Sequence, residues 1–406
     1  MVNLGDRAYH VGLHNLLTEH LEHKITMGPV KALPYLTSRK TRHIRDAKDV
    51  RDLFERWWME ISRYNNGVGS WSDKIKNPFE NNWLTRSNWF QKLDDQVRYR
   101  LARGAIETIS PYLFRSSFVT DLIERIENAD LVLFNGGAFI ADHLDRYLPM
   151  VLFELYVAKK LGKPTAIVNQ TVSINKTANR AMVTYLYSIL DGHWVREPRS
   201  KSILEEMGIP SDRVHLSCDA AFGLPLPEPS GLASSGAANH VGICVRGDRP
   251  VRSEFWAELS KYLVDRLGLK VSFFFTSRFQ DKKAYDGIHA LYPDVDFLPF
   301  GDFPDLLQSI QSFDFVITDR YHATIFAILA ATPFITMDSN TFKTRGLMDM
   351  VDYPIDVVNE DAELDLVVQN ILRVISDRSS LSDSLREARI KLSNYARSSL
   401  ETLNTL

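Results

Sequence analysis

The residues with the clearest chemical potential are Arg320 and His322, which lie at the start of a nearly all-apolar segment, residues 321–331. A β-branched run ends at Thr318 just before them, and Pro333 stops the segment just after it. This pattern predicts a buried strand followed by a short buried helix. The N-terminus of such a helix presents unpaired backbone N–H groups and the positive end of the helix dipole, which attract phosphate.

An arginine and a histidine at that point would add a bidentate guanidinium and a titratable donor to the helix N-terminus. Each residue alone has a plainer explanation. Arg320 could pair with a nearby carboxylate such as Asp319, which is also the expected helix cap, and His322 could be a satisfied core histidine. Together at the start of one buried helix, they favour anion binding over these structural roles.

Strand-like apolar segments alternate with helix-like segments on both sides of a break in the chain. They are residues 131–134, 165–168, 193–195 and 214–216 before the break, and 241–245, 271–275, 295–298, 313–318 and 334–337 after it. Strict alternation predicts parallel sheets covered on both faces. The expected fold class is therefore α/β, with two facing Rossmann-like domains and an interdomain cleft, the arrangement called GT-B among sugar transferases.

The break is residues 223–240, where three prolines precede a Ser, Gly and Ala stretch without apolar periodicity. We predict an N-terminal, acceptor-side domain over residues 1–222, a linker over 223–240, a C-terminal, donor-binding domain over 241–378 and terminal helices over 379–406.

An insertion at about residues 25–119 interrupts the alternation and contains five of the seven tryptophans, namely Trp57, Trp58, Trp71, Trp83 and Trp89. These side chains could stack on sugar faces, or dock on a membrane surface beside the basic run at 39–56. Packing of an extra subdomain is the favoured interpretation.

The overall charge argues against binding through a general positive field. The 406 residues include 48 Lys and Arg against 51 Asp and Glu, a net charge of −3, which does not fit a nucleic-acid coat or a polybasic membrane binder. Any anion site must therefore be local. The two cysteines, Cys218 and Cys244, lie in or beside apolar runs, and no cluster of His, Cys or carboxylates has ligand spacing. We expect neither a metal nor a cofactor.

The sequence also bears on location. The N-terminus has no basic stretch followed by an apolar run, and no apolar run approaches the roughly 20 residues that a membrane span needs. We expect a cytoplasmic protein without a transmembrane segment.

Several short segments, taken in order, resemble the polysaccharide pyruvyltransferase family. The matching residues are Asn3 to Asp6, Asn135 to Gly137, Gln170, Val195 to Glu197 with Ser200, Leu204 and Gly208, Asp219 to Phe222, Arg246, Arg320 to His322, and Lys343. The sequence also departs from the family. Only Met1 and Val2 precede Asn3, where the family has a full strand, Ala220 replaces a proline, and Asn169 stands where glycine is common. We therefore expect the first strand to be absent or truncated.

The resemblance implies a transferase that moves the pyruvyl group of phosphoenolpyruvate onto two hydroxyls of a sugar as a cyclic ketal and releases phosphate. Arg246, Arg320, His322 and Lys343 would bind this donor. Arg320 and His322 would stabilise the departing phosphate, and His322 is a candidate acid. Asp6 is a candidate base, although it could equally cap the helix bearing Leu13, Leu16, Leu17 and Leu21.

Asn135, Gly136, Gly137 and Gln170 are the candidate residues for the acceptor, a sugar or glycan that could be lipid-linked. The two glycines would let the sugar approach the backbone, although glycines after a strand are also ordinary turn formers.

Two other functions fit the same architecture. A glycosyltransferase could use Arg320 and His322 to hold the diphosphate of a nucleotide-sugar, although no acidic residue is plainly placed for a ribose. A hinged sugar-binding protein would also have two such domains, but these usually carry a secretion signal, and none is visible.

Overall fold

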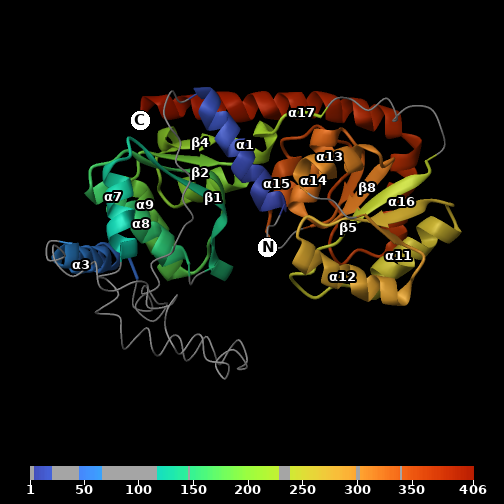
Figure 1. Cartoon of the computed structure of the whole chain (residues 1–406), viewed down its shortest axis with the longest axis horizontal. Helices are drawn as coiled ribbons and strands as arrows, with labels where there is room; N and C mark the ends of the chain where they lie inside the picture. Colours follow the sequence, from blue (N-terminus) through green and yellow to red (C-terminus); the bar gives the residue numbers. More distant parts are fainter. Residues whose placement is uncertain are drawn as a thin grey trace, which may run out of the picture. The chain divides into compact units, whose positions relative to one another are not determined.

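The structure is a computed structural model of the whole chain, and it describes residues 4–20, 45–65, 117–144, 147–227, 238–298, 302–338 and 341–406. Within these residues the protein has an α/β fold with two parallel sheets, as the strand–helix alternation predicted (Figure 1). Asn3, three of the tryptophans and the linker residues 228–237 lie outside the described part. The predicted domain boundaries stay a prediction.

The chain divides into two compact units. Unit 1 contains Met1–Thr26, Trp194–Ser202 and His215–Thr405, and unit 2 contains Met27–His193, Ile203–Val214 and Leu406. Short segments from the N-terminal half of the sequence therefore belong to the same unit as the C-terminal sheet.

The C-terminal sheet has five parallel strands in the order β7-β6-β5-β8-β9. They are β5 (His240–Cys244), β6 (Lys270–Phe273), β7 (Asp296–Phe297), β8 (Phe315–Thr318) and β9 (Phe334–Thr336). The chain adds β6 and β7 on one side of β5, and then returns to place β8 and β9 on the other side. This reversal creates a topological switch point between β5 and β8, the position where open α/β sheets bind ligands beyond the carboxyl ends of the strands.

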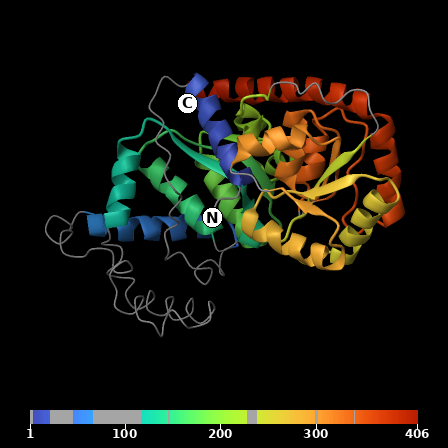
Figure 2. The ribbon, with the colours of Figure 1, turned by 45° about the vertical axis from the view of Figure 1, so that its right-hand side comes forward.

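Helices cover both faces of this sheet. On one face lie α11 (Ser253–Asp265) and α12 (Arg278–Leu291), and on the other lie α13 (Phe303–Gln311) and α14 (Tyr321–Ala330), as right-handed crossovers require (Figures 1 and 2). The segment 321–331 forms the short helix that its apolar residues predicted. All but one of the residues of α14 are buried, and Ala331 ends it in the left-handed region at φ 54°.

The C-terminal helices hold the far end of α14. After α15 (Lys343–Met348) and α16 (Leu364–Ser376), the long helix α17 (Arg378–Glu401) and the short η5 (Thr402–Thr405) complete the chain. From α17, the Ser382 hydroxyl donates to the Ala331 carbonyl at 2.8 Å, and Arg389 donates to the Leu329 carbonyl at 2.9 Å. These bonds satisfy carbonyl groups that the end of α14 leaves without helical partners.

The other sheet has four strands in the order β1-β2-β3-β4: β1 (Val132–Ala141), β2 (Thr165–Ser173), β3 (Gly192–Val195) and β4 (Val214–Leu216). Its associated helices are α3 (Ala47–Asn65), α7 (Ser117–Glu127), η2 (Asp142–Leu144), α8 (Leu148–Lys160), α9 (Thr177–Ile189), α10 (Pro198–Glu206) and η3 (Ser211–Arg213). The described part of the tryptophan-rich segment includes α3, whose Phe54 packs against Phe153 and Tyr156 of α8.

The first helix, α1 (Leu4–His20), packs within unit 1 against the short turn η4 (Ala220–Gly223). The approach is too close for a side chain at Gly12, because a Cβ there would lie 2.0 Å from the Ala220 carbonyl oxygen. Helix α1 begins at Leu4, so Asp6 lies in its first turn and not at the capping position. The side chain of Asp6 is outside the described part of the protein, and its role as a base stays a prediction.

No helix among the residues that the structure describes is both long and apolar enough to cross a membrane.

We predict that Gly12→Ala will destabilise unit 1, because the added methyl group must push η4 away from α1. Overpacking of this kind typically costs about 1–3 kcal/mol in the free energy of unfolding, which urea denaturation can measure. His14→Ala, at an exposed position of the same helix, is the control and should change stability by less than about 0.5 kcal/mol. Equal stability of the two variants would contradict the close contact.

Candidate active site

The ends of β5 and β8 are joined by hydrogen bonds at the switch point. The Thr318 hydroxyl donates to the Cys244 carbonyl at 2.8 Å and accepts from the Arg320 amide at 2.9 Å. Just beyond the ends of the two strands, the Arg246 amide donates to the Asp319 carboxylate at 2.8 Å. The two chain segments that leave these strands are therefore held side by side, and they carry both arginines to the same place.

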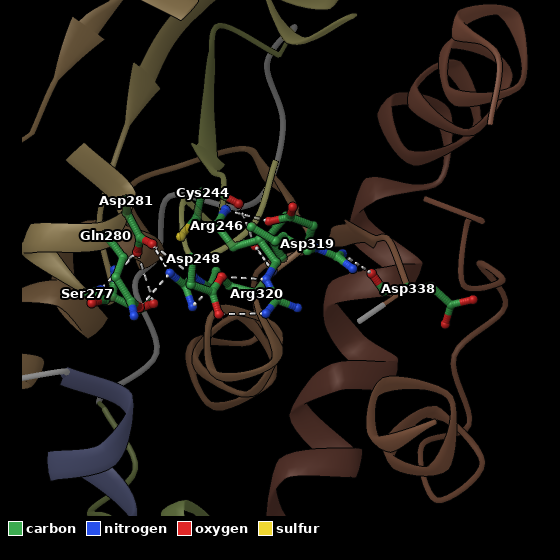
Figure 3. A network of polar contacts seen from close by, with 12 residues as sticks. Cys244, Arg246, Asp248, Ser277, Gln280, Asp281, Asp319, Arg320 and Asp338 are labelled. Atoms are coloured by element: carbon green, nitrogen blue, oxygen red, sulfur yellow. Dashed lines mark hydrogen bonds and ion pairs between the residues drawn. The ribbon is translucent and has the colours of Figure 1, made fainter. Parts of the chain in front are cut away.

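A carboxylate already bridges these two arginines. Asp248 accepts from Arg246 in a bidentate arrangement, at 2.8 Å from Nε and 2.7 Å from Nη2, and lies 3.6 Å from Nη1 of Arg320. Figure 3 shows the Asp248 carboxylate between the two guanidinium groups. Burial alone would raise the pKa of Asp248, but the hydrogen bond from Arg246 and the charges of Arg320 and Arg246 outweigh it and lower that pKa to about 2. The pair is therefore arranged to bind a carboxylate or a similar planar anion.

A second carboxylate fixes the direction of Arg320. Asp281 of α12 is buried and accepts from Nε of Arg320 at 2.8 Å and from its Nη2, while Gln280 accepts from the same Nη2 at 3.2 Å (Figure 3). Asp281 also accepts from the Thr276 and Ser277 amides, at 3.0 and 2.8 Å, where α12 begins. Arg320 thus pairs with carboxylates, as the plainer explanation expected, but Asp319 is not among these ion-pair partners.

The expected capping role of Asp319 is wrong. Arg320 occupies the N-cap position of α14 and makes no side-chain cap, whereas Asp319 accepts from the Arg246 amide across the switch point. The local sequence suggested a helix cap. The Asp319 carboxylate instead binds the backbone amide of Arg246, which follows β5 and lies 73 residues away in the sequence.

A buried ion pair lies behind the start of α14. Arg196 donates to Asp219 at 2.6 Å, and the side chains of both are almost completely buried. The Cζ atom of Arg196 lies 4.7 Å from the ring centre of Tyr321, the first residue of α14. The main partner of Arg196 is therefore Asp219, whereas the adjacent Glu197 lies 3.9 Å away.

Lys343 lies against the same tyrosine ring, with Nζ 5.3 Å from its centre. Loss of hydration, together with the charges of Arg196, Arg246 and Arg320, lowers the pKa of Lys343 to about 7. Helix α15, which Lys343 begins, packs closely on Glu197, because a Cβ at Gly346 would lie 2.6 Å from Glu197 Cγ. A lysine held in this way is protonated in only part of the molecules at neutral pH.

His322 follows Tyr321 in α14. Desolvation, with smaller effects of Arg196, Lys343 and Arg320 that oppose the attraction of Asp219, lowers the pKa of His322 to about 3. The imidazole is therefore neutral at neutral pH. A neutral imidazole can donate one N–H and accept at its other nitrogen, but it carries no proton as an imidazolium.

The four predicted donor-binding residues Arg246, Arg320, His322 and Lys343 thus belong to unit 1, along with the carboxylates that orient them. Neither Asp248 nor Asp281 was among the residues predicted from the sequence. Asp248 follows Arg246 by two residues, which a search for carboxylates beside a strand-end arginine could have found.

The predicted acceptor residues gather in unit 2 on the paired strands β1 and β2. Asn135 and Gly137 lie opposite Val168 and Gln170, and the side-chain Nδ2 of Asn169 donates to the side-chain Oδ1 of Asn135 at 3.0 Å. The expected turn at Asn135–Gly137 is wrong. Strand β1 continues to Ala141, with its irregularity after Gly137, so these residues lie within the sheet.

Local geometry explains the residue types here. Gly137 and Asn169 have φ angles of 47° and 54°, in the left-handed region where glycine is favoured and asparagine is tolerated best among other residues. A Cβ at Gly136 would lie 2.6 Å from that of Gln170. Gln170 itself is fully buried and accepts from the Tyr187 hydroxyl, so its side chain links β2 to α9.

Within the described ranges, no group of three or more His, Cys, Asp or Glu side chains could hold a metal ion.

Comparison with solved structures places the fold. The chain is similar to Anabaena Alr3699/HepE in complex with UDP, with a TM-score of 0.51 and 14% identity over 71% of this chain and 82% of that one. It is also similar to S. aureus TarM, with a TM-score of 0.50 and 13% identity over 70% of this chain and 57% of that one. This likeness shows a GT-B-like fold built from two Rossmann-like domains.

The family follows from the sequence itself. The model of the polysaccharide pyruvyl transferase family matches residues 3–341, and the chain belongs to this family of enzymes. A comparison with curated proteins gave no match.

We predict that Arg196→Met will lower the free energy of unfolding by roughly 3–5 kcal/mol, because it leaves Asp219 buried without its counter-charge. Arg196→Met combined with Asp219→Asn should recover much of this loss, since asparagine removes the charge and keeps the oxygen that accepts from the Ala221 amide. Urea denaturation measures both. As a control, Lys282→Met breaks an exposed pair with Asp286 and should cost less than about 1 kcal/mol. A double variant no more stable than Arg196→Met would contradict this charge balance.

Proposed function

We propose that the chain transfers the pyruvyl group of phosphoenolpyruvate to two hydroxyls of a sugar or glycan as a cyclic ketal and releases inorganic phosphate. Membership of the family supports the reaction class. The observation that carries the donor assignment is the convergence of Arg246 and Arg320 on one carboxylate, Asp248, at the switch point. Phosphoenolpyruvate presents a carboxylate and a phosphate on adjacent atoms, and both suit guanidinium groups.

Arg246 keeps donor capacity for this ligand. Its Nε and Nη2 serve Asp248, and Nη1 has no hydrogen-bond partner in the part of the chain that the structure describes. In Figure 3 the two guanidinium groups meet at the half-buried Asp248 side chain. A ligand carboxylate could bind at the remaining edge of Arg246, with Lys343 as a second cation.

The start of α14 supplies the complementary phosphate position. The first backbone N–H groups of a buried helix lack helical partners and carry the positive end of its dipole. Arg320 stands at the N-cap of this helix, and neutral His322, its second residue, can donate an N–H in the first turn. We assign the phosphate of the donor to this position, where the departing group would gain charge as the bond to C2 breaks.

The proposed acceptor position lies on the paired strands β1 and β2 of unit 2. We place a sugar hydroxyl pair at unit 2, near Asn135 and near Gly137, where the backbone departs from that of a regular strand. A cytoplasmic location, a lipid-linked acceptor and peripheral membrane contact stay predictions.

We predict that phosphoenolpyruvate will raise the melting temperature of the protein, and that UDP, GDP and CMP will not. Arg246→Gln should weaken phosphoenolpyruvate binding by about 2 kcal/mol or more, roughly 30-fold in Kd by calorimetry, because a charged hydrogen-bonding partner is lost. Arg246 is the better probe than Arg320, since removing Arg320 would leave the buried Asp281 without its main partner.

The matched control is Arg373→Gln, which removes an exposed arginine of α16 and should leave both binding and melting temperature unchanged. Stabilisation by UDP without stabilisation by phosphoenolpyruvate would replace this proposal with a nucleotide-sugar glycosyltransferase.

We further predict that phosphoenolpyruvate binding will weaken as pH rises through about 7, because the pKa of Lys343 in the free protein lies there and deprotonation removes a cation from the site. Lys343→Arg keeps the charge at every relevant pH, since an arginine does not titrate in this range. The measurement is the Kd of the wild type divided by the Kd of Lys343→Arg, at pH 6 and at pH 8. Titration of the ligand phosphate affects both proteins, so a change in this ratio reports the titration of Lys343. A constant ratio would show that Lys343 does not contribute its charge.

A further inference from the structure

Asp319 occupies the centre of the switch point. It directly follows β8 and precedes Arg320, and its Oδ1 accepts from the Arg246 amide at 2.8 Å. The residue as a whole is partly buried, and its carboxyl group has lost much of its hydration. The residue therefore lies between the two arginines that we assign to the donor.

Asp319 differs from the neighbouring carboxylates in its partners. Asp219, Asp248 and Asp281 each contact a guanidinium group within 4.0 Å. Among the residues that the structure describes, Asp319 forms no such ion pair, and its hydrogen-bond donor is an uncharged backbone amide. A carboxyl group in this setting loses hydration without gaining a direct counter-ion, which favours its neutral, protonated form.

Burial, more than the charges around it, determines the pKa of Asp319. Desolvation raises the pKa of Asp319 to about 7, against the opposing effects of the Arg246 amide and of the charges of Arg246, Arg320 and Arg249. A large fraction of the molecules therefore carries a proton at this position at neutral pH. Binding of a trianion nearby would favour that proton further, because a charged Asp319 would repel the ligand.

We propose that Asp319 is the acid that protonates C3 of the enolpyruvyl group, an inference that rests on the proposed function. In this step one acceptor hydroxyl oxygen bonds to C2, the π electrons of the C2–C3 double bond form the new C3–H bond, and Asp319 becomes a carboxylate.

The remaining atoms and charges balance without another reactant. The C2–O bond to phosphate then breaks, phosphate leaves with the electron pair, and the second hydroxyl oxygen bonds to C2 to close the ketal. Of the two hydroxyl protons, one restores Asp319 and the other leaves on the phosphate. The charges of Arg246 and Arg320 act on the carboxylate formed in the first step from beyond ion-pair distance and partly stabilise it.

The other titratable groups suit this step less well. His322 is neutral and has no imidazolium proton to give. Lys343 lies on the Tyr321 ring, and its charge is needed to hold the donor, so a proton given from it would weaken donor binding in the same step.

The test is Asp319→Asn, which keeps an oxygen for the Arg246 amide and cannot transfer a proton. Calorimetry with phosphoenolpyruvate should give a Kd equal to or lower than that of the wild type. Phosphate release from phosphoenolpyruvate, with the p-nitrophenyl hexoside that the wild type accepts best from a panel, should fall about 10²–10⁴-fold in kcat. Asp286→Asn, at an exposed position of α12, is the matched control and should behave as the wild type.

Asp319→Glu keeps the acid and provides a second measurement if the asparagine variant folds poorly. It should retain part of the activity, together with the decline of kcat above about pH 7 that deprotonation of the acid causes in the wild type. In Asp319→Asn the residual activity should lose that decline. A kcat and a pH profile like those of the wild type in the asparagine variant would overturn the proposed role of Asp319 and leave the proposed function unaffected. Absence of phosphoenolpyruvate binding by the wild type would instead overturn the proposed function.

Discussion

The feature on which the site depends is the bridging of Arg246 and Arg320 by Asp248. Two guanidinium groups that converge repel each other, and this repulsion grows where burial removes the screening effect of water. The shared carboxylate offsets it, and Asp281 and Asp219 do the same for the outer side of Arg320 and for Arg196. The structure can therefore hold these arginines close together before any ligand arrives, so that less reorganisation is needed when an anion binds.

The same balance connects the site to distant parts of unit 1. Gly12 lets α1 approach η4, whose preceding residue Asp219 accepts from the Ala221 amide and from Arg196. Arg196 then stacks on Tyr321, the residue that begins α14. At its other end, α14 is held by Ser382 and Arg389 of α17. The start of α14 is thus positioned by elements from both ends of the sequence, while the residues that follow His322 in this helix are mostly apolar and buried.

Local hydrophobicity and strand–helix alternation predicted the parallel sheets and the buried helix, and the structure confirms both. Arg320 and His322 were selected by their place at the start of that helix, and Arg246 and Lys343 by resemblance to the family. Their role in donor binding stays a prediction. The sequence did not predict the carboxylates. Asp281 reaches Arg320 from a helix 39 residues away, and no local pattern encodes that distance. Asp319 had a plausible local role as a cap, yet the adjacent strand supplied a better donor. At Asn135–Gly137 the glycines suggested a turn, whereas pairing with β2 extended the strand through them.

Charge balance also constrains how a trianion can enter. Asp248 and Asp281 already pair with these arginines. A ligand with three negative charges therefore needs positive charge in addition to that of the arginines. The site can obtain it in two ways, since Lys343 and Asp319 both titrate close to neutral pH. Uptake of a proton by Lys343 adds a cation, and retention of a proton by Asp319 removes an anion. If phosphoenolpyruvate is the donor, as we propose, its binding would be coupled to protonation, and the proton retained on Asp319 is the one that the proposed step transfers to C3.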